Sequence, residues 1–500
     1  MGGVAPRAML KNSPIWWSFW GKVGSQIVGF FVSLWMARTI GPEAYGIYGA
    51  AFVAVQFLRY LEGGGILSAM VQSHRDVELP VTFADAYVRK IGLFLAVIAA
   101  LAAWPVATFF GQEAVRPVVW VLACSIVVRS WGIVPLARLT KNILVSRVVV
   151  ARLVGLATGS VVGITWAVHS PDVWALVALA VAQDLAQTVV LRLSIAKVVP
   201  DTSKRLQAFR DMRKFGWKVI FGELVSWFHL NAWEVLTGRF VSTSALAYVR
   251  LSRSVVERPL SPITEVVSGV VFPTMASYDV ADAKRTWRTS FIFLVYLTAV
   301  WIYVMGILGG SVIVVMLGQD WLPLEKLIRY AGMLQSIVLL YAFQTRAMTV
   351  IGRPLNDGFF QLAGVVSIGV WLMVIRFGMN LPVDRPEPIA VAIVIGMLTY
   401  LTLSFLAVAR HYEITRLATS SVLRPIIFLV ISIFMVFTYE FPRPTDWTFA
   451  FASSTAVISG MALWTIFIDP DTKELIPAML YRRPPRPTTL KDSVTKRGYD

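Results

Sequence analysis

The sequence of 500 residues is poor in the side chains that hold metals and form disulfides, with one cysteine, Cys124, and four histidines. A single cysteine excludes an intrachain disulfide, a zinc site built from cysteines and an iron–sulfur cluster. The histidines show no metal-ligand spacing, and no Gly-x-x-x-x-Gly-Lys-Ser/Thr loop is present. The sequence therefore predicts no cofactor and no direct use of ATP.

Charged residues are also scarce. They make up 15% of the chain and hydrophobic residues 57%, whereas about a quarter of a soluble domain is charged. This composition excludes a soluble enzyme, a disordered scaffold and a disulfide-rich secreted module. Fourteen apolar stretches have the length of about 20 residues that crosses a bilayer. The expected spans are residues 14–38, 44–71, 88–109, 115–136, 147–168, 171–192, 217–240, 244–276, 289–316, 322–346, 355–378, 388–410, 420–440 and 447–468.

The distribution of Lys and Arg orients the chain, because these residues collect in cytoplasmic connections. With both termini in the cytoplasm, the cytoplasmic side carries 31 Lys and Arg and the opposite side seven. This split explains most of the net charge of +17, so nucleic-acid binding is not expected. The longest internal connection, residues 193–216, interleaves basic and apolar residues and predicts a basic helix on the cytoplasmic membrane surface.

No Gly/Ser linker divides the chain, so we expect one membrane domain of the all-α class. Span seven begins about 200 residues after span one, and Tyr48 and Tyr248 recur at that offset. This repeat predicts two six-helix lobes followed by two further helices. The predicted parts are a transmembrane domain at 1–470, with lobes at about 14–192 and 215–410 and helices at about 420–468, and a basic cytoplasmic tail at 471–500.

Eight cations fall inside predicted spans, where topology does not explain them. A cation at the bilayer centre costs roughly 2.5 to 3.5 kcal/mol, so eight facing lipid would cost on the order of 20 kcal/mol. We therefore expect these side chains to face protein or water. They are Lys22, Arg59, Arg129, Arg152, Arg250, Arg253, Arg258 and Arg329.

Fewer acids than cations share the spans, and the surplus of positive charge predicts a water-filled cavity for an anionic substrate. Two alternatives stay open. The charges can pair to hold helices together, as Arg253 and Glu257 would at i and i+4, and Arg152 and Arg329, near span ends, can extend to the membrane interface. The six acids are Glu62, Asp184, Glu223, Glu234, Glu257 and Glu265.

Four of these acids are candidates for ion coupling, because a group inside the membrane that changes protonation or binds Na⁺ can link transport to a gradient. Glu223 and Glu234 are eleven residues apart and share one face of span seven; Asp184 and Glu62 complete the set. The alternative is that they only neutralise arginines. Spans eleven to fourteen contain no mid-span charge.

Several short motifs resemble those of a known family. Residues 37–46 read Ala-Arg-Thr-Ile-Gly-Pro-Glu-Ala-Tyr-Gly, and a long helix separates them from Gly-Gly-Ile-Leu-Ser-Ala-Met-Val-Gln at 64–72. Phe-Gly at 215–216, Phe-Pro-Thr-Met-Ala at 272–276 and Gly-Arg-Pro at 352–354 fit as well. The chain resembles bacterial Wzx-type exporters, the lipid-linked oligosaccharide flippases of the multidrug/oligosaccharidyl-lipid/polysaccharide (MOP) exporter superfamily. The three glycines at 63–65 depart from the single Gly-Leu step of its relatives.

The resemblance implies two six-helix lobes around a central cavity in the bacterial cytoplasmic membrane. It implies a substrate of sugars on polyprenyl pyrophosphate, moved to the outer leaflet for lipopolysaccharide or exopolysaccharide biosynthesis. Alternating access would be driven by a gradient of H⁺ or Na⁺. The implied partners are the lipid-linked oligosaccharide and membrane lipids, and the resemblance allows a complex with a polysaccharide polymerase. No enzymatic activity is expected.

Two other functions remain as alternatives. A membrane glycosyltransferase or polymerase of lipid-linked sugars would use carboxylates on long extracytoplasmic loops, yet the longest outer connection here, residues 379–387, is short. A drug/cation antiporter would carry substrates that an arginine-rich cavity repels.

Overall fold

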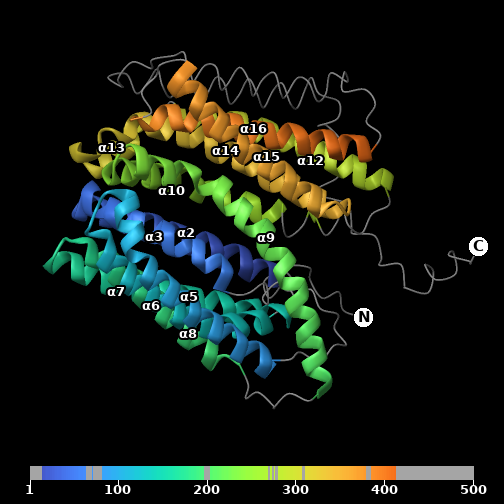
Figure 1. Ribbon diagram of the computed structural model, residues 1–500, viewed down its shortest axis with the longest axis horizontal. Helices are drawn as coiled ribbons and strands as arrows, with labels where there is room; N and C mark the ends of the chain where they lie inside the picture. Colours follow the sequence, from blue (N-terminus) through green and yellow to red (C-terminus); the bar gives the residue numbers. More distant parts are fainter. Residues whose placement is uncertain are drawn as a thin grey trace, which may run out of the picture.

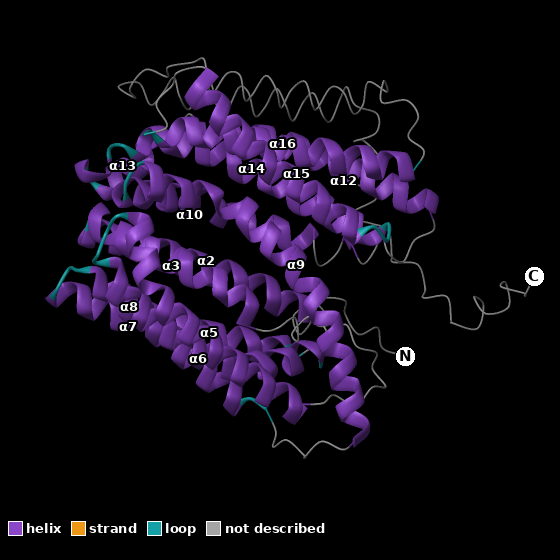
Figure 2. Ribbon diagram, in the orientation of Figure 1, coloured by secondary structure: helices purple, strands orange, loops and turns teal. Residues whose placement is uncertain are grey.

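The computed structural model describes residues 14–62, 70, 81–142, 144–195, 203–267, 271–272, 275, 280–306, 310–378 and 384–412. In these ranges the chain is helical and contains no strand (Figures 1 and 2), which confirms the predicted all-α class. The predicted helices at 420–468, the tail at 471–500 and the glycines at 63–65 lie outside the described residues. The helices are α2 (Pro14–Ile40), α3 (Pro42–Glu62), α5 (Val81–Phe110), α6 (Val115–Lys141), α7 (Val145–His169), α8 (Val173–Leu193), α9 (Ser203–Phe240), α10 (Thr243–Val266), α12 (Val280–Val304), α13 (Gly310–Leu317), α14 (Leu324–Val350), α15 (Pro354–Met373) and α16 (Pro386–His411), with short turns η3 (Gln319–Trp321) and η4 (Val374–Gly378).

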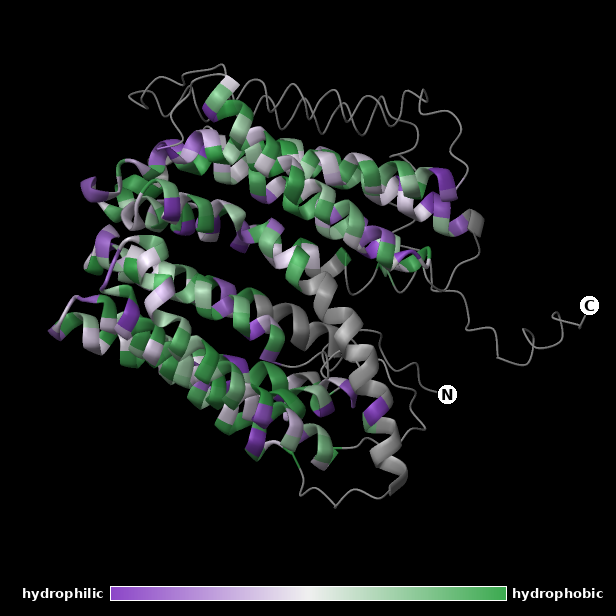
Figure 3. Cartoon of the chain, viewed as in Figure 1, coloured by the Kyte–Doolittle hydropathy of each residue, from purple (hydrophilic) through white to green (hydrophobic). Residues whose placement is uncertain are grey.

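Eight of the described helices are long and apolar enough to cross a membrane, so the chain is a multi-pass membrane protein. Apolar side chains on their outer surfaces are exposed, as lipid-facing positions require; Leu101 on α5 is 75% exposed. Figure 3 shows hydrophobic residues along most of the helix surface. Four other long helices, α3, α9, α10 and α14, are not among the eight, and each carries charged residues within its length.

Two motif segments form tight connections between helices. Gly41, with φ of +82°, separates α2 from α3, and Pro42 begins α3. Gly352, with φ of +73°, precedes the start of α15 at Pro354. Glycine adopts this left-handed conformation without the steric penalty of a Cβ, and proline suits the first turn of a helix because its missing N–H has no intrahelical partner there.

The helices form two groups, which Figure 1 shows as blue to teal and green to orange bundles. The N-terminal group comprises α2, α3 and α5 to α8, and the C-terminal group α9 to α16. The second helices of the two groups, α3 and α10, pack against each other. At this crossing a Cβ on Gly46 would overlap the Thr243 carbonyl, so glycine permits the close approach.

Close packing within the N-terminal group depends on three glycines that the sequence places at four-residue spacing. A Cβ on Gly155 would lie 2.9 Å from the Gln183 carbonyl oxygen, and one on Gly159 would lie 2.6 Å from that of Leu179. Gly163 also faces α8. These glycines therefore let α7 and α8 approach closely.

Helix α9 corrects the predicted arrangement of residues 193–240. The sequence predicted a separate surface helix before span seven, but one continuous helix runs from Ser203 to Phe240. Its first half reaches the N-terminal group, where Phe209 packs on Phe83 and Tyr87 with ring centroids 6.3 and 5.3 Å apart. Its second half packs against α10, α15 and α16. Figure 1 shows α9 crossing between the groups.

Two other predicted spans include residues outside the described ranges. Span nine, expected at 289–316, contains α12, which ends at Val304, and α13, which begins at Gly310; residues 307–309 lie outside the described residues. Span eight, expected at 244–276, contains α10, which includes Pro259 and Pro262 and ends at Val266; residues 268–270 lie outside the described residues.

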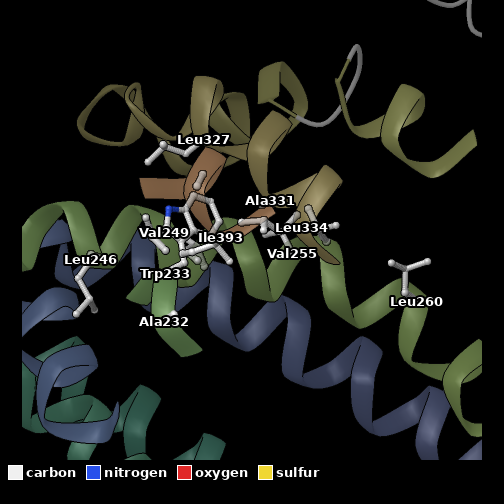
Figure 4. Close-up of a cluster of buried hydrophobic side chains, with 14 of the residues drawn as sticks. Ala232, Trp233, Leu246, Val249, Val255, Leu260, Leu327, Ala331, Leu334 and Ile393 are labelled. Atoms are coloured by element: carbon white, nitrogen blue, oxygen red, sulfur yellow. The ribbon is translucent and has the colours of Figure 1, made fainter. Parts of the chain in front are cut away.

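Helix α10 has an apolar face and a charged face. Figure 4 shows its apolar residues, including Val249, Val255 and Leu260, in a buried cluster with α14 and α9. The side chains of Arg250 and Arg253 lie on the other face of α10 and line the cavity between the two groups. The apolar face thus anchors α10 in the C-terminal group and presents its arginines to the N-terminal group.

Candidate functional site

A cavity of about 640 Å³ lies between the two helix groups. Residues from α2, α3, α6, α7, α8, α9 and α10 line it, so both groups form its walls. Six arginines and three acids are among the lining residues. They are Arg59, Arg129, Arg152, Arg250, Arg253 and Arg258, with Asp184, Glu234 and Glu257.

The N-terminal wall holds a cluster of two arginines and two carboxylates. Arg59 Nη2 donates to Asp184 Oδ2 at 2.8 Å and to Ser125 Oγ at 2.5 Å. Arg129 reaches Asp184 Oδ1 at 3.3 Å and Glu62 Oε2 at 3.5 Å. Asp184 and Glu62 are both buried. This N-terminal cluster has no formal net charge.

The C-terminal wall repeats this arrangement. Glu234 on α9 accepts from Arg250 Nη1 at 2.9 Å and from Arg253 Nη1 at 3.0 Å. Arg253 also contacts Glu257 at 3.4 Å, which confirms the pair predicted from their i, i+4 spacing. Asn231 Oδ1 accepts a further hydrogen bond from Arg253 at 2.9 Å. This C-terminal cluster also pairs two arginines with two carboxylates.

Two cavity arginines stand outside both clusters. Arg152 on α7 and Arg258 on α10 line the cavity, and neither forms an ion pair or a side-chain hydrogen bond with any described residue. Arg258 Nη1 is buried without a hydrogen-bond partner in the described part of the chain. The positive surplus of the cavity therefore resides at these two positions.

The other predicted site residues fall elsewhere. Lys22 lies in α2 and Glu223 in α9, but their side chains are outside the described residues. Arg329 lies in the second turn of α14 and does not line the cavity. The cavity thus brings together six of the eight predicted cations, and their role in substrate binding stays a prediction.

Three of the four predicted coupling acids contact arginine. Asp184, Glu234 and Glu62 all belong to the two clusters described above. These contacts fit the alternative that the acids neutralise arginines. Their role in ion coupling is untested by this geometry and stays a prediction.

One buried acid was missed in the sequence because it lies near the start of predicted span eleven. Asp357, in the first turn of α15, is 5% exposed and has no arginine or lysine partner among the described residues. Its carboxylate accepts hydrogen bonds from Tyr400 Oη and Gln361 Nε2, each at 2.7 Å. Ser226 Oγ on α9 donates to Gln361 Oε1 at 2.7 Å. Helices α9, α15 and α16 therefore meet at this polar network inside the C-terminal group.

His229 lies beside the network. Its ring packs edge-on against Tyr341 and Tyr400, with centroids 5.2 and 6.2 Å away. Both ring nitrogens are buried without a hydrogen-bond partner in the described residues.

One end of the cavity is closed by contacts between the groups. Trp321, 1% exposed, packs edge-on against Tyr45 of α3 and Tyr248 of α10, with centroids 5.8 and 5.5 Å apart. Within the C-terminal group, Tyr248 Oη donates to the Asp320 carbonyl at 3.0 Å and so supports Trp321. Between the groups, Arg38 Nη1 on α2 donates to the Met316 carbonyl at 3.0 Å. We call this set of contacts the end closure. It lies on the side that the charge distribution predicts to be extracytoplasmic.

This arrangement is the fold of membrane flippases and multidrug transporters. The lipid II flippase MurJ in an inward closed conformation superimposes with a TM-score of 0.68 at 14% identity, over 91% of this chain and 98% of that one. An inward-facing multidrug resistance transporter of the MATE family, in the MOP superfamily, gives 0.61 at 13% identity, over 79% and 96%.

The family follows from the sequence match. The model of the polysaccharide biosynthesis protein family matches residues 35–326, which is more than half of the chain, so the chain belongs to this family. It is 22% identical over 330 residues to the succinoglycan biosynthesis transport protein ExoT of Rhizobium meliloti (strain 1021). The match spans 64% of each protein, less than two thirds of that relative's length. The resemblance to exporters of this superfamily is thereby confirmed.

Proposed function

We propose that the protein is a flippase that moves polyprenyl-pyrophosphate-linked oligosaccharide from the cytoplasmic to the outer leaflet for surface polysaccharide biosynthesis. The observation that carries this proposal is the cavity between the two helix groups, whose described lining includes six arginines and three acids. An intramembrane cavity with surplus positive charge suits an anionic headgroup. It disfavours the cationic substrates of a drug antiporter.

The relatives support a transport function rather than catalysis. ExoT is a transport protein of succinoglycan biosynthesis, and MurJ is a lipid II flippase. The first name describes transport and the second describes flipping of a lipid. We place the chain in the bacterial cytoplasmic membrane, as the family resemblance implies. The distribution of Lys and Arg predicts that both termini lie in the cytoplasm.

The two-group architecture supports a mechanism of alternating access. In the conformation described, the end closure joins α2 and α3 to α10, α13 and η3. The substrate headgroup would enter from the cytoplasmic side, and rocking of the two lobes, at about residues 14–192 and 215–410, would break the end closure and expose the cavity outside. The polyprenyl chain would stay in the bilayer.

Energy coupling requires a group in the membrane that gains and loses a proton or Na⁺. Asp357 suits this role better than Glu62, Asp184 and Glu234, because no arginine neutralises it among the described residues. A carboxylate removed from water needs a neutralising proton or cation. The groups that face it are Tyr400 of α16 and Gln361 of its own helix, with Thr345 and Tyr341 of α14 and His229 of α9 packed against Tyr400.

The test uses purified protein in vesicles that carry a fluorescent lipid-linked oligosaccharide. A membrane-impermeant reductant bleaches the outer leaflet, so a flippase raises the bleached fraction above that of protein-free vesicles, without new glycosidic bonds. New glycosidic bonds would favour the glycosyltransferase or polymerase, and a bleached fraction equal to that of empty vesicles contradicts the proposal.

A further inference from the structure

The charges around the cavity divide into balanced and unbalanced sets. Four arginines belong to the N-terminal and C-terminal clusters, in which four carboxylates match them. Arg152 and Arg258 remain, one on each wall, without a carboxylate partner among the described residues. Among the described residues that line the cavity, an anionic ligand would find compensated arginines at the clusters and uncompensated ones at these two positions.

Arg258 reaches from the C-terminal group to the opposite wall. A Cβ on Gly29 of α2 would lie 3.4 Å from Arg258 Nη1 and 4.0 Å from Leu156 Cδ1 of α7. The guanidinium therefore lies against α2, beside α7. Its Nη1 is buried and lacks a hydrogen-bond partner in the described residues, which is unfavourable for a charged donor unless a ligand supplies the acceptor.

Arg152 lies one helical turn before Leu156 on α7, and all three residues, Arg152, Leu156 and Arg258, line the cavity. Residues four apart stand one above the other on a helix face. Arg152 and Arg258 thus approach one region from opposite groups. Each guanidinium offers a planar fork of donors that fits phosphate oxygens.

Resting on the proposed function, we propose that Arg152 and Arg258 form the headgroup subsite and select a diphosphate over a monophosphate. A diphosphate that links a lipid to a sugar carries one negative charge on each phosphate, which equals the formal charge of the two free arginines. A monophosphate linkage would leave one of them uncompensated. Because the arginines come from different groups, the bound diphosphate also joins the two walls.

The test compares two probes that share the same sugar and polyprenyl chain, one linked through a diphosphate and one through a monophosphate. Binding is measured with the full chain in lipid nanodiscs, for the parent and for Arg152→Gln and Arg258→Gln. Each variant should bind the diphosphate probe about tenfold to hundredfold more weakly, because it loses charge-assisted hydrogen bonds to the headgroup. Each should also lose most of the parent's preference for the diphosphate probe over the monophosphate probe. Arg116→Gln, which removes an arginine paired with Glu113 outside the cavity, is the matched control.

Two further measurements keep the result specific. Neither Gln variant breaks an ion pair, so both should keep the parent's thermal unfolding midpoint. Inorganic pyrophosphate should displace the diphosphate probe from the parent and do so less well in the variants, which tests the headgroup apart from the lipid. Variants that fold as the parent does and keep its preference for diphosphate overturn the subsite.

The outcome separates this inference from the proposed function. If the parent moves lipid-linked oligosaccharide across vesicles and both variants retain the diphosphate preference, the subsite is wrong and the flippase stands. If the parent binds diphosphate through both arginines but moves no lipid, the flippase is wrong and the subsite stands.

Discussion

Trp321 offers a direct way to perturb the end closure. Its ring is 1% exposed and contacts Tyr45 of the N-terminal group. Replacing a buried tryptophan with alanine costs about 3–5 kcal/mol in total, but only contacts between the groups shift their equilibrium. The aromatic pair and the apolar area it covers account for about 1–3 kcal/mol. Trp321→Ala should therefore shift the population toward the outward-open state by about 5- to 150-fold.

Cysteine accessibility measures this shift. Cys124 is exposed and the sequence has no other cysteine, so Cys124→Ser gives a clean background. Ala180 on α8 lines the cavity, and Ala180→Cys changes its volume little. A membrane-impermeant maleimide added outside right-side-out vesicles should label this cysteine slowly in the parent and faster with Trp321→Ala.

The matched control is Trp287→Ala. Trp287 is also 1% exposed, but it stacks on Phe291 and Phe405 within the C-terminal group, away from the end closure. It should lower thermal stability to a similar degree without faster labelling. Equal labelling in Trp321→Ala and its parent, or an equal rise in Trp287→Ala, would refute the assigned role of Trp321.

Three further predictions concern the helix contacts and the polar networks. Asp184→Asn removes the carboxylate that Arg59 and Arg129 share, so the free energy of unfolding, measured in detergent, should fall by about 3–5 kcal/mol. Adding Arg59→Gln should recover part of this loss, and no recovery would contradict the pairing. Gly159→Ala should lower the thermal unfolding midpoint, because the new Cβ would meet the backbone of α8. Gly369→Ala, which has open space around it, should stabilise the protein by up to about 1 kcal/mol. Equal effects of the two variants would argue against close packing of α7 on α8. Asp357→Asn should retain substrate binding and lose the response to an imposed H⁺ or Na⁺ gradient in vesicles; an unchanged response would remove Asp357 from coupling.

Local sequence signals predicted most helix ends, but they also predicted a helix boundary that the structure does not contain. Gly41 and Pro42 mark a helix boundary through their backbone preferences alone, and the structure places it there. The basic stretch before Phe215 was interpreted as a separate surface helix because its charge changes abruptly. Charge does not end a helix, and the backbone continues unbroken from Ser203 to Phe240.

Spacing within one helix predicts neighbours on that helix and misses partners on others. Arg253 and Glu257 pair as their spacing predicted. Arg59 and Glu62 share the same face of α3, yet Arg59 binds Asp184 and Glu62 contacts Arg129. The sequence did not predict Asp357 as a buried acid, because a predicted span boundary lies within two residues of it. Its burial depends on packing against α16.

The pairing of charges carries more functional information than their number. The clusters are neutral within each group, so they keep their ion pairs whether the groups approach or separate. Arg152 and Arg258 belong to different groups, and closing an empty cavity would bring like charges together, at roughly 4 kcal/mol for a 4 Å separation in a protein-like dielectric of about 20. A bound diphosphate would attract both arginines, and this attraction would replace the repulsion between them. On the proposed assignment, the same two residues therefore recognise the headgroup and disfavour closure without it, which links substrate occupancy to the movement that transport requires.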